Sequence, residues 1–586
     1  MSGLKEPEEL EPAQGSLRLA SADDTATRAD WEAATAAVLR KTGKLAEGEP
    51  DSAVWDKLSR STLDGIRVAP IGTPEQVAGL TTAGRPTRTD DWDIRVHVVG
   101  PDARSANEAV LVDLENGATS LWIELGSGLS AADLPTVLDG VLLDLAPVVL
   151  DGGGPAAAAA LLDLATDRGV DLHPATNLGA DPLGDDLLII TTLARQAGVR
   201  GVVVDAARVH DRGASDAQEL GFSIASGVHV LRVLTEAGLT VDEAARLVEF
   251  RYAASDEQFP TIAKLRAARR LWARVLELSG ATSEAGEQRQ HAVTSRAMMT
   301  KYDPWVNMLR GTVAAFSAGV GGAESVTVVP FDEPLGLPDA FGRRIARNTS
   351  SLLISESHLA KVVDPAGGAY AVERLTDDLA AAGWAELGRI EESGGLAAAL
   401  ADGSFDARVD AVVAERDKQV ALRRRPITGL SEFPNLQEQL PARAVAPESA
   451  ASRTVRRYGA AFEALRDEPA ASPVFLATLG PIAAHTARAT FASNLLAAGG
   501  VAVDVAGATD GVDALLSAYG GQKVVCLAGT DAAYAEWGEA AAAALRDAGA
   551  RHVVIAGKAT EWVDDSCARG VDALAFLTRT REELAR

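Results

Sequence analysis

The sequence predicts an α/β protein with two domains, a parallel (β/α)8 barrel of TIM type followed by a smaller, flavodoxin-like doubly wound sheet. Three observations support this prediction. The chain has 586 residues, too many for one ordinary core. Its first part alternates short apolar runs with amphipathic helices over about 250 residues, as a parallel barrel requires. Its last part resumes this alternation after a segment rich in proline and charge.

The composition is globular and disfavours several classes of partner. Hydrophobic residues make up 47% of the chain, charged residues 24%, and the net charge is −26. A surface this negative repels nucleic acid and anionic membranes. The apolar runs are strand-sized, far below the ~20 residues of a membrane span, and the N-terminus is acidic, unlike a signal or transit peptide. Cys526 and Cys567 are too few for a disulfide framework or a cysteine zinc site. We therefore expect a cytoplasmic protein with two buried thiols, no metal site, no nucleic acid partner and no membrane partner.

The first region, residues 1–75, is expected to hold an arm and a helical segment. Residues 1–28 carry much charge and little periodicity, which is typical of disorder or of an arm that wraps a partner. From Thr27 to about Arg60 the sequence predicts a helix. Apolar residues recur there at helical spacing, namely Trp31, Ala34, Val38 and Leu39.

The barrel is expected over residues 76–418. Residues 79–100 have alternating, strand-like character, and further strands are predicted at 121–125, 148–150, 201–204, 248–252, 292–296 and 326–330. The intervening helices are predicted at 155–168, 185–196, 216–237, 260–278, 304–318 and 341–355. Six or seven strand–helix units can be assigned in this way.

Residues 419–472 are predicted to form a linker that crosses a surface, because they are rich in proline and charge. The second α/β domain follows at 473–586. Five apolar runs, VFLATLG, VAVDVAG, VVCLAG, VVIAG and VDALAFL, are predicted to be its strands.

Four stretches of this sequence resemble the methylmalonyl-CoA mutase family. They are residues 262–276 (IAKLRAARRLWARVL), 298–332 (MMTKYDPWVNMLRG and onward), 344–376 (RIARNTSSLLISESHLAKVVDPAGGAYAVERLT) and 423–435 (RRRPITGLSEFPN). The order of barrel, linker and small domain matches the family as well. Taken singly, such stretches also suit a scaffold; Arg266, Arg269 and Arg270, for example, have the pattern of a solvated helix face.

The resemblance implies radical chemistry with adenosylcobalamin, whose cobalt ligand is the histidine of an Asp-x-His-x-x-Gly motif after the first strand of the small domain. Here that stretch is residues 481–488, PIAAHTAR. If His485 takes the ligand position, the aspartate becomes Ala483 and the glycine becomes Arg488. If the alignment slips by one, the histidine position is Ala484. The motif fails in either alignment.

Two other pocket motifs of the family are altered in the small domain. The Ser-x-Leu after the third strand becomes Ala528–Gly529–Thr530, and the glycine pair after the fourth strand becomes Ala556–Gly557. We therefore expect the domain to be a degenerate cobalamin-binding type, with no cofactor-binding residues.

The barrel motifs that hold the substrate in the family are also altered. The entrance segment corresponds to residues 84–92, which keep Arg85–Pro86 but lack the family's tyrosine. The family's Tyr-His pair falls on Ala207 and Arg208. His210, two residues on, is either a displaced substitute or, as we favour, a histidine in a surface loop. No catalytic or substrate-binding residue is predicted in this chain.

These observations favour the small (beta), non-catalytic subunit of a heterodimeric methylmalonyl-CoA mutase of propionate metabolism. The partner would be the large catalytic subunit, which would bind adenosylcobalamin and the acyl-CoA, while this chain alone would be inactive. Two alternatives remain. One is an active adenosylcobalamin-dependent acyl-CoA mutase with an altered site, and the other is a non-catalytic regulator that binds acyl-CoA in the barrel.

Overall fold

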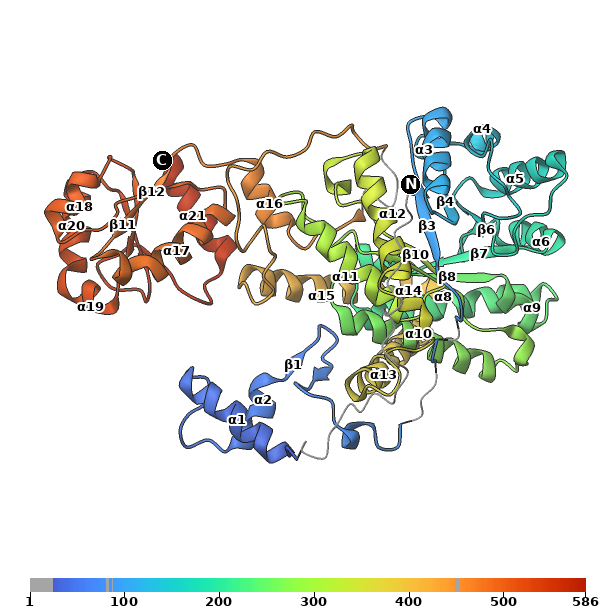
Figure 1. Ribbon diagram of the computed structural model, residues 1–586, viewed down its shortest axis with the longest axis horizontal. Helices are drawn as coiled ribbons and strands as arrows, with labels where there is room; N and C mark the ends of the chain where they lie inside the picture. The colour runs from blue at the N-terminus through green and yellow to red at the C-terminus, as the bar shows by residue number, and fades with distance from the viewer. Residues whose placement is uncertain (1–24, 81–83, 87, 448–453) are drawn as a thin grey trace, which may run out of the picture. The chain divides into compact units, whose positions relative to one another are not determined.

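The computed structural model describes residues 25–80, 84–86, 88–447 and 454–586 (Figure 1). The chain divides into two compact units, Met1–Gly72 and Thr73–Arg586. Within the described residues, no helix is both long enough and apolar enough to span a membrane.

The N-terminal unit is a small helical body. Helix α1 (Arg28–Lys41) begins at a capping box formed by Thr27 and Asp30, and it is followed by η1 (Asp51–Ala53), α2 (Val54–Leu58) and the antiparallel pair β1 (Arg60–Ser61) and β2 (Arg67–Val68). The prediction of one helix to Arg60 is therefore wrong. Gly43 adopts a left-handed conformation (φ 69°) after α1, and Pro50 cannot continue a helix. The arm predicted at the N-terminus lies, for residues 1–24, outside the described residues.

The second unit begins with a closed parallel barrel, as predicted. In the described part of the chain its eight strands are β3 (Asp93–Val98), β4 (Ser120–Glu124), β5 (Val148–Asp151), β6 (Asn177–Ala180), β7 (Arg200–Asp205), β8 (Val248–Ala254), β9 (Gln290–Thr294) and β10 (Ser325–Thr327), and β10 closes on β3. Strand β6 has no counterpart among the predicted strands. It is short, and Leu178 is its one large apolar residue. Gly179, whose φ is 77°, lies where a side chain would strike Leu150 O, so the strand lacks the apolar run by which the other strands were predicted.

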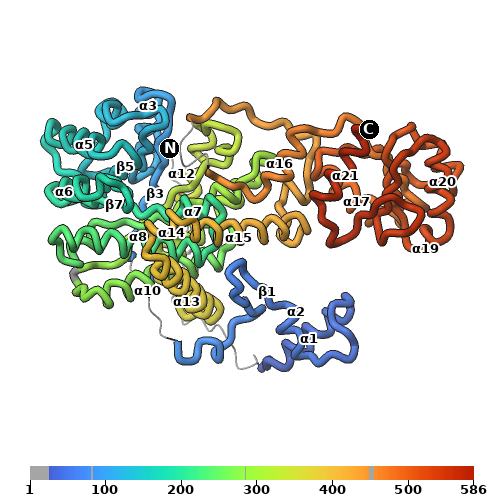
Figure 2. Tube along the Cα trace, turned by 180° about the vertical axis from the view of Figure 1, so that it is seen from behind, coloured from blue at the N-terminus to red at the C-terminus, as the bar shows by residue number. Residues whose placement is uncertain are grey.

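Helices surround the barrel and pack against its outer face (Figures 1 and 2). The main ones are α3 (Ala103–Glu115), α5 (Gly154–Arg168), α6 (Leu187–Ala197), α8 (Asp216–Glu236), α10 (Gln258–Leu278), α11 (Val306–Val320) and α12 (Ala340–Ser355), with the shorter α4 (Leu134–Val137), α7 (Ala207–Asp211) and α9 (Val241–Arg246) between them. All six predicted helices are present, with ends shifted by a few residues. After the barrel come α13 (Tyr370–Glu392), α14 (Leu396–Ala401) and α15 (Ser404–Ala421), and α13 packs along α8 and α10.

Two arginines of α10 are buried, so the interpretation of this run as a solvated helix face is wrong for them. Arg266 donates to Glu373 of α13 at 2.7 Å, and Arg269 donates to Gly84 O at 3.1 Å. Arg270 is partly exposed and pairs with Asp377 of α13 at 2.8 Å. The run thus fixes α10 to α13 and to the entrance segment.

The C-terminal sheet has the strand order β12-β11-β13-β14-β15, all parallel, which is the flavodoxin-like order. Its strands are β11 (Val474–Thr478), β12 (Val503–Val505), β13 (Val524–Ala528), β14 (His552–Ala556) and β15 (Asp565–Cys567), and its helices are α17 (Ile482–Ala498), α18 (Val512–Ala518), α19 (Asp531–Ala533), the π-turn η8 (Tyr534–Gly538), α20 (Glu539–Asp547) and α21 (Ala573–Ala585). Cys526 and Cys567 are buried and free, as expected.

The fifth predicted strand, VDALAFL, is wrong. This run begins helix α21, because Asp572 caps the helix through its side chain by accepting from Ala575 N. The real fifth strand is the short polar segment β15, which lies at the sheet edge and pairs only with β14.

The predicted linker does not simply cross a surface. Helix α15 runs into it and α16 (Ala460–Asp467) lies within it, while residues 448–453 are outside the described part. Leu430 and Phe462 are fully buried in a core that also contains Leu476 of β11 and Phe576 of α21. In this segment the apolar residues occur singly between prolines and charged residues. They pack onto the C-terminal sheet.

Candidate functional site

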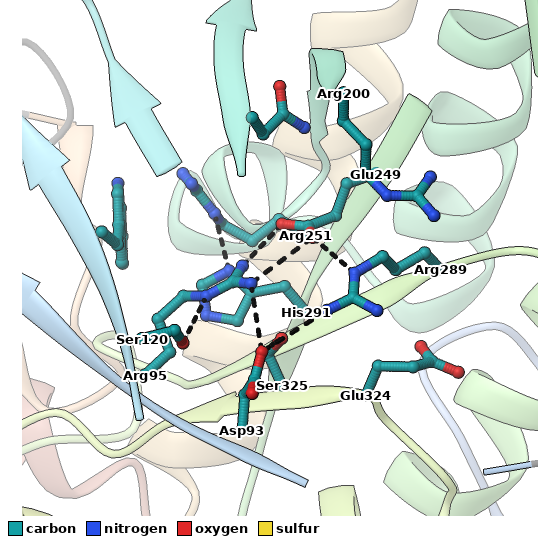
Figure 3. A network of polar contacts seen from close by, with 12 residues as sticks. Asp93, Arg95, Ser120, Arg200, Glu249, Arg251, Arg289, His291, Glu324 and Ser325 are labelled. Atoms are coloured by element: carbon teal, nitrogen blue, oxygen red, sulfur yellow. Dashed lines mark hydrogen bonds and ion pairs between the residues drawn. The ribbon is translucent and has the colours of Figure 1, made fainter. Parts of the chain in front are cut away.

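The lower interior of the barrel is filled by a charged cluster (Figure 3). Arg95 of β3 donates to Glu249 of β8 at 2.6 Å and to Ser120 at 3.2 Å, and Arg289 also donates to Glu249 at 3.1 Å. Strands β3 and β8 are not neighbours, so the Arg95–Glu249 pair spans the lumen. Burial alone would raise the pKa of the Glu249 carboxyl, but Arg95 and Arg289 lower it to about 2. The cluster therefore carries fixed, compensated charges.

A second layer crosses the barrel above the first. Arg251 of β8 donates to Asp151 at the end of β5 and to Asp205 at the end of β7, each at 2.8 Å. Its guanidinium carbon lies 3.9 Å from the centre of the Trp122 ring, whose ring in turn stacks on His97 with centroids 3.9 Å apart. Arg251 is 1% exposed and Trp122 4%. Bulky charged and aromatic side chains thus occupy the axis of the barrel.

A cavity of about 590 Å³ lies above this layer, at the carboxyl ends of the strands, where barrels of this type place their active sites. Its polar lining includes Asp151, Asp181, Asp205, Arg208, Arg251 and Arg296. Asp211 lines it as well, and burial raises the pKa of its carboxyl to about 6. Trp122 and Arg251 line its base, so the cavity is not continued through the lumen.

Ala207 and Arg208, the positions expected to correspond to the family's Tyr-His pair, both line this cavity from α7. Arg208 makes ion pairs with Asp151 at 2.7 Å and with Asp205 at 3.2 Å. These carboxylates, Asp151 first, raise the pKa of Arg208. Arg208 and Arg251 therefore neutralise the same two carboxylates at the cavity base. Of the entrance segment, Arg85 lies 3.9 Å from Asp364, and residue 87 falls outside the described residues.

His210 is buried, so its interpretation as a surface-loop histidine is wrong. Its exposure is 4%; Nε2 lies 2.7 Å from Ser295 Oγ and 3.4 Å from Tyr458 Oη, and Nδ1 lies 3.6 Å from Glu219. Glu219 is itself paired with Lys264 at 2.6 Å. His210 is not among the described residues that line the barrel cavity, and this polar cluster ties α7 to α8 and α10.

In the C-terminal domain, His485 lies on the first turn of α17. It is 5% exposed, and its Nδ1 is 3.2 Å from Gly480 O, so this nitrogen donates to a backbone carbonyl. Ala483, at the aspartate position, offers no side-chain partner. Among the described residues, no group of three or more histidine, cysteine or carboxylate side chains could hold a metal ion.

The other predicted positions meet at the carboxyl ends of β13 and β14. Ala528 and Ala556 are buried at these strand ends, and Arg488 of α17 donates to Gly529 O at 2.8 Å. Gly557 is close to Arg488 and also to Tyr534. Tyr534 is not among the positions predicted from the family motifs. In the sequence it is marked only as an aromatic residue that follows the small residues of the stretch GTDAAYAEW.

Comparison with known proteins agrees with the motifs and the fold. The family model for methylmalonyl-CoA mutase matches residues 188–514. The chain is similar to the methylmalonyl-CoA mutase small subunit of Streptomyces virginiae, with 47% identity over 97% of this chain and 98% of that one. The probable small subunit of Mycobacterium tuberculosis is 40% identical over 92% and 93% of the two chains, and that of Propionibacterium freudenreichii subsp. shermanii 36% over 94% and 92%. The chain therefore belongs to the methylmalonyl-CoA mutase family and, within it, to the small subunits.

Proposed function

We propose that this chain is the non-catalytic partner in a heterodimeric methylmalonyl-CoA mutase, an isomerase that interconverts methylmalonyl-CoA and succinyl-CoA. In this proposal the large subunit binds adenosylcobalamin and the acyl-CoA and performs the reaction, and the present chain supports it structurally. The relatives named as small subunits match nearly the whole chain, which supports this assignment.

The non-catalytic role is supported by the side chains that fill the lumen of the barrel. Arg95, Glu249 and Arg251 cross the axis with 1% exposure or less. Separating these buried ion pairs to admit a substrate would cost several kcal/mol for each ion. This argues against both alternatives, the altered but active mutase and the acyl-CoA-binding regulator, because each needs the barrel to accept the substrate.

The residues of the C-terminal domain do not fit adenosylcobalamin. His485 is buried, and Ala483 cannot polarise its ring as a carboxylate would. Arg488 stands where the family is expected to have the glycine that makes room for the cofactor, and its side chain lies beside Gly557. No step of the reaction is therefore assigned to this chain.

Co-expression of this chain with the large-subunit homologue tests the proposal. We expect a one-to-one heterodimer in size exclusion with light scattering, with an obligate interface of more than about 2,000 Å². Cobalamin and turnover should be found only in preparations that contain the large chain. A monodisperse homodimer that ignores the homologue at micromolar concentration would contradict the partnership, and succinyl-CoA formed by this chain alone would contradict the non-catalytic role.

A further inference from the structure

Two side chains from different helices meet above the carboxyl ends of β13 and β14. Tyr534, the first residue of the π-turn η8, is 8% exposed. Its hydroxyl accepts from Gly529 N at 3.0 Å and lies 3.1 Å from Leu527 O and 2.9 Å from Ala556 O, to one of which it donates. The hydroxyl thus satisfies backbone groups of both strands at their ends.

Arg488 of α17 holds the tyrosine ring from the other side. Its guanidinium carbon lies 5.0 Å from the centre of the Tyr534 ring, while Nη1 donates to Gly529 O and Nη2 pairs with Asp531. The ring and the guanidinium are therefore fixed by contacts to the loop that follows β13.

The backbone after β14 packs directly against this pair. A Cβ added at Gly557 would lie 3.3 Å from Tyr534 Cε2 and 3.5 Å from Arg488 Nη1. In a doubly wound sheet, ligands bind in the crevice outside the carboxyl ends of the strands at the switch point, which here lies between β11 and β13. Arg488, from the helix that follows β11, contacts Gly529 O on the β13 side of that point, and Tyr534 lies beside it above β13 and β14. A π-turn is rare and often marks a functional position, and here it begins at the tyrosine itself.

We propose that Tyr534, held by Arg488, is the residue that closes this crevice to ligands. Its ring fills the space that a planar, hydrogen-bonding group of a ligand would take, and its hydroxyl makes the bonds that such a group would make. The domain thereby keeps a complete core without a cofactor. This inference deepens the proposed function and rests on it for the statement that the domain works without a ligand.

Chemical rescue of the full-length Tyr534→Ala variant tests this proposal, with p-cresol as the probe because it has the shape of the missing side chain. We expect the variant's thermal midpoint to fall by about 10 °C. Saturating p-cresol should restore at least half of that loss. Toluene should restore clearly less, because it offers no hydroxyl to Gly529 N and Ala556 O.

Two control variants make the rescue specific. Tyr534→Phe keeps the ring in place, so p-cresol should not shift its midpoint. Tyr519→Ala removes a second tyrosine, which packs on Phe475 at the edge of the same hydrophobic cluster, and it checks that p-cresol does not stabilise every weakened form of the domain. A folded Tyr534→Ala variant with no saturable p-cresol response, or an equal response in Tyr519→Ala, would overturn the proposal.

Hydrogen exchange keeps the proposal testable if Tyr534→Ala does not fold. In Tyr534→Phe the amide of Gly529 loses its acceptor and should exchange at least tenfold faster, and unchanged exchange would overturn the proposal. Failure of the proposed function would show itself differently, as cobalamin binding or turnover by the wild-type chain. Neither of these is read by the rescue experiment, so the two failures are distinguishable.

Discussion

Arg95 and Glu249 form an ion pair across the interior of the barrel, with Nη1 and Oε1 2.6 Å apart and neither side chain exposed to solvent. Because the pair joins β3 and β8, which are not neighbours, its side chains fill the lumen of the barrel. A buried pair of this kind contributes little net stability over apolar residues, but breaking it leaves a charge without a partner.

We predict that Glu249→Gln destabilises the barrel strongly, by about 3–5 kcal/mol. Arg95 and Arg289 lose the nearer of their two shared carboxylates and keep the longer contacts to Asp93, at 3.8 and 3.4 Å. Urea denaturation followed by circular dichroism measures this. The matched control is Glu277→Gln, whose side chain is 69% exposed and pairs with Arg274, and it should change stability by less than about 0.5 kcal/mol. A loss below about 1 kcal/mol for Glu249→Gln would contradict the central role of the pair.

Asp211 should make stability fall as the pH rises from about 4 to about 6. Burial raises its folded pKa to about 6, above the unfolded value of about 3.9. The folded state then binds more protons in this window, so raising the pH through it favours unfolding. Asp211→Asn should remove this slope and be more stable than wild type at pH 7, by about 3 kcal/mol, because the folded pKa already includes the attraction to Arg296.

The difference between the wild-type and Asp211→Asn stability curves isolates this effect. Glu249, whose pKa is lowered to about 2, acts in the opposite sense, since its contribution is lost only as the pH falls below about 4. Parallel curves from pH 4 to pH 6 would show that the Asp211 carboxyl does not titrate in that window.

Arg208 should be dispensable for activity of the heterodimer. We expect Arg208→Ala to leave turnover within twofold, because this barrel binds no substrate in the proposed function. The loss of stability should also be small, below about 1 kcal/mol, because Arg208 is 45% exposed and Arg251 still bridges the same carboxylates. The double change Ala207→Tyr with Arg208→His restores the family's pair, yet it should give the isolated chain no activity while Trp122 and Arg251 fill the cavity base. Turnover by that variant would contradict the interpretation of the lumen.

The isolated chain should not bind hydroxocobalamin. His485 is buried, and Ala483 supplies no carboxylate to polarise its ring. Titration followed by visible spectroscopy should show no saturable change, and His485→Ala should behave like wild type. A saturable spectral shift that His485→Ala abolishes would contradict this prediction.

Local patterns made some elements predictable and hid others. Strand β8 alternates apolar or aromatic residues with Glu249 and Arg251, as a strand does, and it lies where the sequence predicted a strand. Strands β6 and β15 are segments of four and three residues without an apolar run, and pairing with their neighbours decides their conformation. VDALAFL has the residues of a buried strand, but the capping bond of Asp572 turns it into a helix.

For the candidate site, the sequence could identify substitutions but not what replaced the missing chemistry. The substitutions expected at Ala483, Arg488 and Ala207 follow from the resemblance to the family's motifs. The burial of His210 depends on Ser295 and Tyr458, which are 85 and 248 positions away along the chain. Tyr534 acquires its position only when the ends of β13 and β14 are brought together.

The sequence by itself determined the alternation of strands and helices, the two-domain order, the family and the altered motifs, because periodicity and spacing are local properties. Tertiary structure alone decided that the barrel has a filled interior. Arg95 stands on β3, and Glu249 and Arg251 both stand on β8. These strands come within hydrogen-bonding reach across the lumen only when the barrel closes, and the charges are compensated only there. Whether a charged residue is exposed, binds a ligand or fills a core depends on partners distant in sequence, since burial of a charge is tolerated only where such a partner lies within reach.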